Sequence, residues 1–357
     1  MLKQLMLCRK LSSYLRLSLA AFEVGKALLG SSLYSGKDKW VAPYLNAVPS
    51  RVIFASAKLE RMAKEYSLPF KFRRGLEESS LDDIVERGNI VAIKIHVGDM
   101  EGGGFRYIRQ VFVRILVDYV KELGGIPFVT DTWGLRHVLV GLRNGFNYAT
   151  LGAPLIPANG IKENFFYEVE LEKFFRVGKI QVSGNIHDAD VLVNLAHFKG
   201  HGSSGAGGAI KNIAMGCTSY RTRGEIHRLE KLDKIGRAFQ EGMVDAVKAV
   251  LKNKRGKALH VNYVMDVQPT CDCAPWSDIP IVPDIGILIS DDIVAVEHAA
   301  LRMVDEAPTM PGSIAEKLGL KPGDNKWLKI HGKDPYIQVE AGENAGLGVK
   351  DYKIVEV

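Results

Sequence analysis

Two histidines, two lysines, six glycines and a cysteine lie within 21 residues, in the segment HFKGHGSSGAGGAIKNIAMGC at residues 197–217. The segment follows DADVLVNLA at residues 188–196, whose apolar composition predicts a buried β-strand. Ligands of open α/β sheets bind beyond the carboxyl ends of strands, so we expect a functional site here. His197 and His201 are therefore candidate catalytic or ligand groups, and local hydrogen bonding is the alternative for each.

The glycines at residues 205–211, GAGGAIK, lead into a predicted helix. Small residues let the backbone approach an anion, and the N–H groups at a helix N-terminus attract negative charge. Lys211 would add a full positive charge and is also a candidate catalytic residue. We expect a phosphate- or carboxylate-binding site; close packing of helix against strand is the alternative. The predicted anion-binding residues are Lys199, Gly205, Gly207 and Gly208.

Four cysteines are too few for a disulfide scaffold, which favours reduced thiols in a reducing compartment. Cys217 ends the histidine- and glycine-rich segment, and Cys271 and Cys273 form a C-x-C motif in DVQPTCDC at residues 266–273. Thiolates beside imidazoles suit zinc, another transition metal or an iron–sulfur cluster such as [4Fe–4S]. We predict that the three thiols lie together as ligands; buried inert thiols are the alternative.

A second polar pair occurs in NIVAIKIH at residues 89–96, a nearly continuous apolar strand. Lys94 and His96 are two positions apart, so the strand can place both on one face. His96 is a further candidate for acid–base catalysis, and a paired polar spot beneath a helix is the alternative. Asp131 and Asp266 also follow predicted strands, where a carboxylate can orient a ligand histidine.

The elements that must position these residues alternate between strand and helix. Apolar strands are predicted near residues 50, 90, 128, 190, 260 and 287, with amphipathic helices between several of them. This pattern predicts an α/β fold with a mixed, largely parallel sheet flanked by helices. The predicted divisions are an N-terminal helical extension and linker (1–49), an α/β lobe with the histidine and glycine segment (50–220), and a second α/β lobe with the C-x-C motif (221–357). We expect a cleft between the two lobes.

Composition restricts the class of protein. The net charge of +6 is mild for 357 residues, and no run of Lys and Arg contains interleaved aromatics, so a nucleic-acid partner is not indicated. No stretch of about 20 apolar residues could span a membrane. Arg9, Lys10 and Arg16 interrupt the apolar residues at the N-terminus, which argues against a signal peptide. A transit peptide or interfacial helix is an alternative to a docked helix or an extension, and we predict a cytoplasmic protein.

The chain resembles domain-of-unknown-function family 362, whose α/β members sometimes carry iron–sulfur clusters. The matching segments lie at residues 91–99, 128–132, 193–217, 266–273 and 284–299. Many relatives insert a ferredoxin-like, cysteine-rich segment after the equivalent of residues 224–227, but residues 223–243 contain no cysteine here. The resemblance therefore implies cluster binding through Cys217, Cys271 and Cys273 alone.

A looser likeness is to lactate racemase, which has a similar histidine, glycine and lysine segment. That likeness implies a cofactor-anchoring role for Lys211 and a catalytic role for His201 or His197.

Three functional hypotheses follow from these observations. The first is a metal- or iron–sulfur-binding enzyme that acts on a small anionic metabolite or cofactor in the cleft. The second is racemase-like hydride or proton transfer that uses Lys211 and a histidine. The third is a non-enzymatic electron-transfer or cluster-scaffold protein with a redox partner protein.

Overall fold

The computed structural model describes residues 48–98, 105–132, 134–274 and 276–357. Every described residue belongs to one compact unit. The predicted N-terminal extension lies almost wholly outside the described residues.

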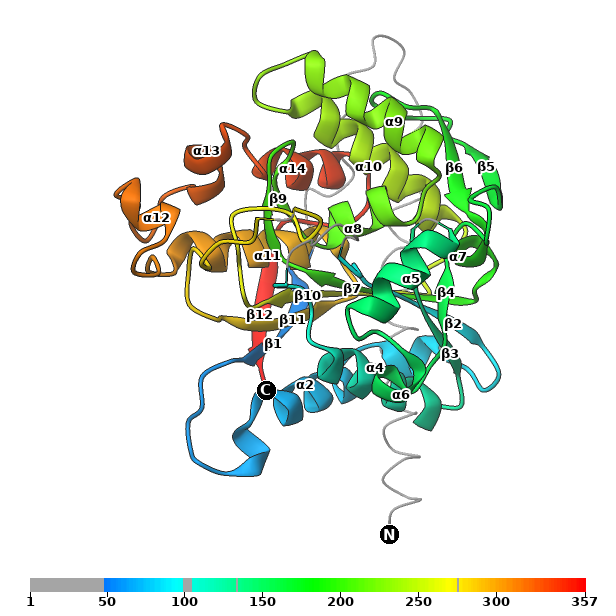
Figure 1. Ribbon diagram of the computed structural model, residues 1–357, viewed down its shortest axis with the longest axis horizontal. Coiled ribbons are helices and arrows are strands. Elements are labelled where there is room, and N and C mark those ends of the chain that lie inside the picture. The colour runs from blue at the N-terminus through cyan, green and yellow to red at the C-terminus, as the bar shows by residue number, and fades with distance from the viewer. Residues whose placement is uncertain (1–47, 99–104, 133, 275) are drawn as a thin grey trace, which may run out of the picture. The chain divides into compact units, whose positions relative to one another are not determined.

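An eight-stranded sheet forms the centre of this unit (Figure 1). All neighbouring strands are parallel except at β11, which runs antiparallel to both of its neighbours. The predicted α/β fold with a mixed, largely parallel sheet is therefore confirmed. In spatial order the strands are β12 (Tyr352–Glu356), β1 (Ser50–Ser56), β11 (Gly286–Ser290), β10 (Ala258–Val264), β7 (Val191–His197), β2 (Ile90–Lys94), β3 (Ile126–Asp131) and β4 (Leu155–Pro157).

Helices cover both faces of this sheet (Figure 1). The helices α2 (Leu68–Glu77) and α4 (Gln110–Glu122) pack on one face, and α8 (Ala209–Gly216), α10 (Arg237–Lys252) and α11 (Ile293–Glu306) pack on the other. Two apolar cores result, one on each side of the strands. Every residue of β7 is buried, which explains its continuous apolar run: a central parallel strand has no solvent-facing side.

The remaining elements connect or extend these layers. The pair β5 and β6 forms a small antiparallel sheet, and β8 and β9 form another. These elements are η1 (Lys64–Tyr66), α3 (Leu81–Ile84), α5 (Leu135–Arg143), α6 (Tyr148–Leu151), β5 (Phe166–Glu170), β6 (Lys179–Ser183), α7 (Gly184–Asp188), β8 (Lys199–His201), β9 (Gly205–Gly207), α9 (Tyr220–Arg228), η2 (Leu229–Lys231), α12 (Ile314–Lys317), α13 (Lys326–His331) and α14 (Tyr336–Asn344). No helix within the described ranges has the length and apolar composition needed to cross a bilayer.

The order of the strands reverses between β2 and β7. From β2 the chain proceeds outward through β3 and β4, whereas β7 and β10 are added on the opposite side of β2. The loops that follow β2 and β7 therefore leave in opposite directions, and such a switch point creates a crevice at the carboxyl edge of a sheet. Strands from both expected lobes, 50–220 and 221–357, belong to this one sheet, in which β7 and β10 are adjacent.

Candidate functional site

A cavity of 510 Å³ lies at the carboxyl edge of the sheet, beside the switch point. Its walls come from the ends of β2 and β3, from the β8–β9 hairpin, from α8 and from the loop after β10. The charged side chains that line it are Lys94, Arg136, Lys199, Lys211, Arg223, Asp131 and Glu163. Cationic groups thus outnumber carboxylates, so the cavity favours an anionic ligand.

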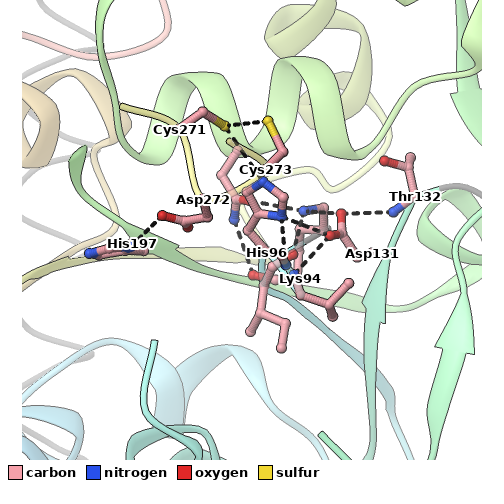
Figure 2. Close-up of polar contacts among 12 residues, drawn as sticks. Lys94, His96, Asp131, Thr132, His197, Cys271, Asp272 and Cys273 are labelled. Atoms are coloured by element: carbon pink, nitrogen blue, oxygen red, sulfur yellow. Dashed lines mark hydrogen bonds and ion pairs between the residues drawn. The ribbon is translucent and has the colours of Figure 1, made fainter. Parts of the chain in front are cut away.

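Two thiols and an imidazole meet in this cavity (Figure 2). The sulfur atoms of Cys271 and Cys273 lie 3.0 Å apart, and Nε2 of His96 lies 3.8 Å from Sγ of Cys271. The donor atoms of all three residues lie within 4.8 Å of one another, and no other described His, Cys, Asp or Glu residues form such a group. Two sulfur donors and one imidazole suit a transition metal of the zinc type.

The carboxylate of Asp131 orients His96. Its Oδ2 lies 3.3 Å from Nδ1 of His96, and its Oδ1 forms a buried ion pair with Nζ of Lys94 at 2.8 Å (Figure 2). Burial lowers the pKa of His96, but contact with Asp131 and Cys271 outweighs burial and raises it to about 9. A carboxylate on Nδ1 leaves Nε2 directed at the thiols, as in many metal sites. Lys94 and His96, which the sequence placed on one face of a strand, both contact Asp131.

Cys273 donates a hydrogen bond to Cys271 across the 3.0 Å between the two sulfur atoms. Contact with Cys273, together with His201, His96 and Lys211, holds the pKa of Cys271 well below its ordinary value. The same contact between the sulfurs raises the pKa of Cys273. Cys271 is therefore the sulfur that ionises first, and a thiolate is the form that binds metals.

The residue between the cysteines anchors their turn. Asp272 is fully buried, and its Oδ1 lies 2.8 Å from Nδ1 of His197 while its Oδ2 lies 3.1 Å from Nζ of Lys199. Gln268 donates a further hydrogen bond to Oδ1 at 3.2 Å. Burial raises the pKa of Asp272, but His197 and Lys199 outweigh burial and lower it to about 2. Asp272 is therefore ionised, and it holds the C-x-C turn against β7 and β8.

His197 was expected to act in the cavity, and the structure places it elsewhere. Its side chain is fully buried and does not line the cavity. Nε2 donates to the backbone carbonyl of Met265 at 2.8 Å, and Nδ1 faces Asp272. Both ring nitrogens are thus engaged within the fold, which leaves His197 a structural role beneath the C-x-C turn.

Gly200 permits the close approach of β8 to this turn. Its N–H donates to the carbonyl of Gln268 at 2.8 Å, and a Cβ at this position would lie 2.0 Å from the carbonyl oxygen of Pro269. No residue other than glycine fits without movement of one of the two backbones. The sequence pattern gave no indication of this contact.

His201 and Lys211, two of the predicted catalytic residues, both line the cavity. Burial, followed by the charge of Lys211, lowers the pKa of His201 to about 4, and burial lowers the pKa of Lys211. No ion pair joins Lys211 to a carboxylate among the described residues. A neutral imidazole and an amine with a depressed pKa are therefore available for proton transfer or nucleophilic chemistry.

The predicted anion site at the start of α8 is already occupied by a protein carboxylate. The buried side chain of Glu297 on α11 accepts from the N–H of Ile210 at 3.4 Å and also interacts with the N–H of Ala209. A Cβ on Gly208 would lie 2.6 Å from the Glu297 carboxylate. Burial raises the pKa of Glu297 to about 7. These two N–H groups of α8 therefore face Glu297 and are not open to a bound anion.

The other predicted anion-binding residues divide between two places. Lys199, Gly207 and Gly208 line the cavity. Gly205 does not: its φ is +76°, and a Cβ there would lie 2.5 Å from the carbonyl oxygen of Lys333. Gly205 thus serves a turn against the C-terminal part of the chain.

Cys217 is absent from the thiol group. It is fully buried in the core on the α8 side of the sheet, where its carbonyl accepts from the N–H of Ser183 at 2.9 Å. Burial raises the pKa of its thiol to about 12. The expected grouping of Cys217 with Cys271 and Cys273 is wrong, because the end of α8 directs its side chain into the core and away from the cavity.

Sequence reasoning did not identify Arg136 and Arg223, which lie on α5 and α9. Neither follows a strand or belongs to a motif, so no local signal marks them. Nη1 of Arg223 lies 3.4 Å from Oγ1 of Thr132, the residue after β3, which brings its guanidinium to the carboxyl edge of the sheet.

Comparison with known proteins supports a family assignment. Lactate racemase apoprotein from Thermoanaerobacterium thermosaccharolyticum is a similar solved structure, with 15% sequence identity and a TM-score of 0.41. The match covers 61% of this chain and 51% of that one, so it spans about half of the racemase. No curated protein matches the sequence. The model of the family described as Domain of unknown function (DUF362) matches residues 91–302, which is more than half of the 357 residues. The chain therefore belongs to the DUF362 family.

Proposed function

We propose that this protein is a metal-dependent enzyme that acts on a small anionic metabolite. In this proposal His96, Cys271 and Cys273 hold one transition-metal ion at the wall of the cationic cavity. The observation that carries the proposal is the group of two thiols and an imidazole, which opens onto a cavity lined by an excess of lysine and arginine.

The donor set fits a single catalytic ion better than a cluster. Catalytic zinc sites keep three protein ligands and leave a position for water or substrate, and two cysteines with one histidine is one such set. An iron–sulfur cluster usually takes four cysteines, whereas two of the described cysteines meet here. The carboxylate on Nδ1 of His96 and the low pKa of Cys271 both favour metal binding.

The side chains of the cavity have distinct tasks in this proposal. A bound ion would act as a Lewis acid toward an oxygen of the substrate. Lys199, Arg136 and Arg223 favour a carboxylate or phosphate electrostatically. His201 is neutral and can accept a proton, which suits removal of a hydrogen from carbon next to a carboxylate or carbonyl group.

Two measurements test this proposal. Protein purified without oxygen should contain one equivalent of transition metal, and Cys271→Ser should lose it while Cys217→Ser retains it. In heavy water, small carboxylates should be screened by NMR for exchange of the hydrogen next to the carboxylate. Exchange that persists in His201→Asn would contradict the assigned base, and metal that persists in Cys271→Ser would contradict the assigned ligands.

A second candidate is racemase-like hydride or proton transfer that uses Lys211 with His201. The observation in its favour is the depressed pKa of Lys211, which lines the cavity and forms no ion pair within the described ranges. An amine of this kind can attack a carbonyl or carry a covalent cofactor. Intact-mass measurement of protein from its native host tests the cofactor: an adduct on Lys211 supports this candidate, and an unmodified lysine argues against it.

An electron-transfer or scaffold role with a redox partner has less support. Such a role needs no ligand cavity, whereas this group opens onto one of 510 Å³. A metal centre with a reversible potential, in a protein that binds no small anion, would favour this third candidate.

A further inference from the structure

A second cavity, of 620 Å³, lies at the opposite edge of the sheet. Ala258 and His260, at the amino end of β10, contribute to its walls, whereas the first cavity receives residues that follow the carboxyl end of the same strand. The ends of α10 and α14 also contribute. No part of the proposed catalytic chemistry uses this cavity.

Two buried polar side chains line this second cavity, Lys254 and His260. Nζ of Lys254 already donates to the backbone carbonyls of Ile186, His187 and Ala189, which leaves His260 as the group to consider. His260 is 2% exposed, and its Nδ1 lies 3.3 Å from Nδ2 of Asn194. Because the amide nitrogen can only donate, Nδ1 is the acceptor and the ring hydrogen sits on Nε2. Nε2 has no hydrogen-bond partner among the described residues. Burial also lowers the pKa of His260 to about 3, so the ring is neutral and offers one N–H.

The orientation of Asn194 is itself fixed by a buried polar chain. Oδ1 of Asn194 accepts from Nδ2 of Asn212 at 2.7 Å, and Oδ1 of Asn212 accepts from Nζ of Lys94 at 2.9 Å. Lys94 in turn pairs with Asp131 in the first cavity. An ammonium group can only donate. This series of hydrogen bonds, which starts at Lys94 and ends at His260, therefore has a fixed direction at every step. The hydrogen on Nε2 is therefore fixed by the fold, and it is available to an acceptor that binds in the second cavity.

The charges around the cavity indicate the sign of that acceptor. Lys248 and Lys252 line it, and each Nζ donates to one backbone carbonyl, of Lys173 at 3.0 Å and of Glu170 at 3.2 Å. An ammonium has three donors, so each lysine keeps donors for a ligand. Lysines in the last turn of a helix also complement its dipole, but that role does not explain the N–H of His260. The lining lysines outnumber the lining acids, which are Glu172 and Asp291.

Part of the wall is apolar. This part is formed by Leu171, Leu251, Ala258, Ala345 and Leu347. A ligand that fills this cavity must therefore carry both an anionic group and an apolar part. An inorganic anion would leave the apolar side chains in contact with water.

We propose that the second cavity binds a small molecule in which a carboxylate is joined to a short apolar chain. Nε2 of His260 donates to the carboxylate, Lys248 and Lys252 supply positive charge, and the leucines contact the chain. This proposal does not depend on the function proposed for the first cavity.

The test uses the full chain labelled with [¹⁵N]histidine, with sodium hexanoate as the probe and hexanamide as its neutral counterpart. Hexanoate should bind saturably and shift the Nε2 resonance of His260, which the His260→Phe spectrum identifies. Ala345→Trp should fill the cavity without removing a polar contact and should weaken binding at least tenfold. Ala149→Trp, at an exposed alanine on α6, is the matched control and should leave binding unchanged.

Three results would overturn the proposal: no saturable binding, equal binding of hexanamide, or full binding by Ala345→Trp. Binding that leaves the His260 resonance unmoved would place hexanoate at another site and would also count against the proposal. Because Ala345→Trp keeps the buried polar chain intact, the test stands even where His260→Phe fails to fold.

Discussion

Replacement of Asp272 by asparagine perturbs the anchor of the C-x-C turn while keeping its shape. The carboxylate is fully buried between Nδ1 of His197 and Nζ of Lys199, at 2.8 and 3.1 Å. Asparagine removes the negative charge but retains one oxygen acceptor. The variant therefore leaves the positive charge of Lys199 without its counter-charge in a buried place.

The size of the effect follows from that geometry. Breaking a buried ion pair costs about 3–5 kcal/mol, and the retained acceptor together with the second bond of Lys199, to the carbonyl of His197, favours the lower end, about 3 kcal/mol. Partners that orient metal ligands contribute roughly 10–100-fold in affinity. We therefore expect Asp272→Asn to lose about 3 kcal/mol of unfolding free energy and to bind metal at least tenfold more weakly.

Urea denaturation of metal-free protein and Co²⁺ titration measure the two effects separately. Asp245→Asn is the matched control, because Asp245 is also a buried carboxylate but accepts only from the N–H groups of Phe175, Arg176 and Val177. The control should lose stability and keep its Co²⁺ affinity. If both variants weaken Co²⁺ binding equally, or neither does, the assigned role of Asp272 is wrong.

Three further changes have defined outcomes. Cys217→Ser should leave Co²⁺ binding unchanged but cost about 1–3 kcal/mol by urea denaturation, because a hydroxyl replaces a buried thiol. Glu297→Gln should flatten the pH dependence of stability: the pKa of Glu297 is raised from 4.5 to about 7, so its contribution is full below pH 4.5 and is lost as the pH rises through 7. The variant should therefore match wild type at pH 4 and exceed it by up to about 3 kcal/mol at pH 8; a parallel pH profile would contradict this. Gly200→Ala should lower the free energy of unfolding by about 1–3 kcal/mol and weaken Co²⁺ binding, since its Cβ would lie 2.0 Å from the oxygen of Pro269. Unchanged Co²⁺ affinity would show that Gly200 does not support the C-x-C turn.

The fold class could be predicted from the sequence because central parallel strands are buried on both faces. Every residue of β7 and of β10 is buried, so both appear in the sequence as nearly unbroken apolar runs. The candidate site was suggested by the same signal, because polar residues after such strands meet at one edge of the sheet. His96 and His201 were chosen in this way and Lys211 from the glycines before its helix, and all three line the cavity.

Contacts that depend on strand register could not be predicted. His197 meets Asp272 only because β7 and β10 pair with Tyr263 opposite His197, which sends the loop after β10 back over the end of β7. Glu297 reaches the first turn of α8 from a helix that begins some 80 residues later along the chain. No local pattern encodes either contact.

The direction of a side chain at a helix end could not be predicted from the sequence either. Cys217 adjoins Gly216, which lines the cavity, yet its own side chain packs in the core. Cys217 is the residue after the last turn of α8, and its backbone is no longer helical, so proximity in sequence did not place the third thiol with the other two.

The central claim is that His96, Cys271 and Cys273 hold one transition-metal ion, and X-ray absorption of the metal-loaded protein tests it most directly. The predicted spectrum has two sulfur ligands and one imidazole nitrogen, with lighter atoms completing the shell. Cys273→Ser should lose one sulfur, and His96→Ala should lose the imidazole signal. A shell without sulfur, or one left unchanged by both substitutions, would contradict the account.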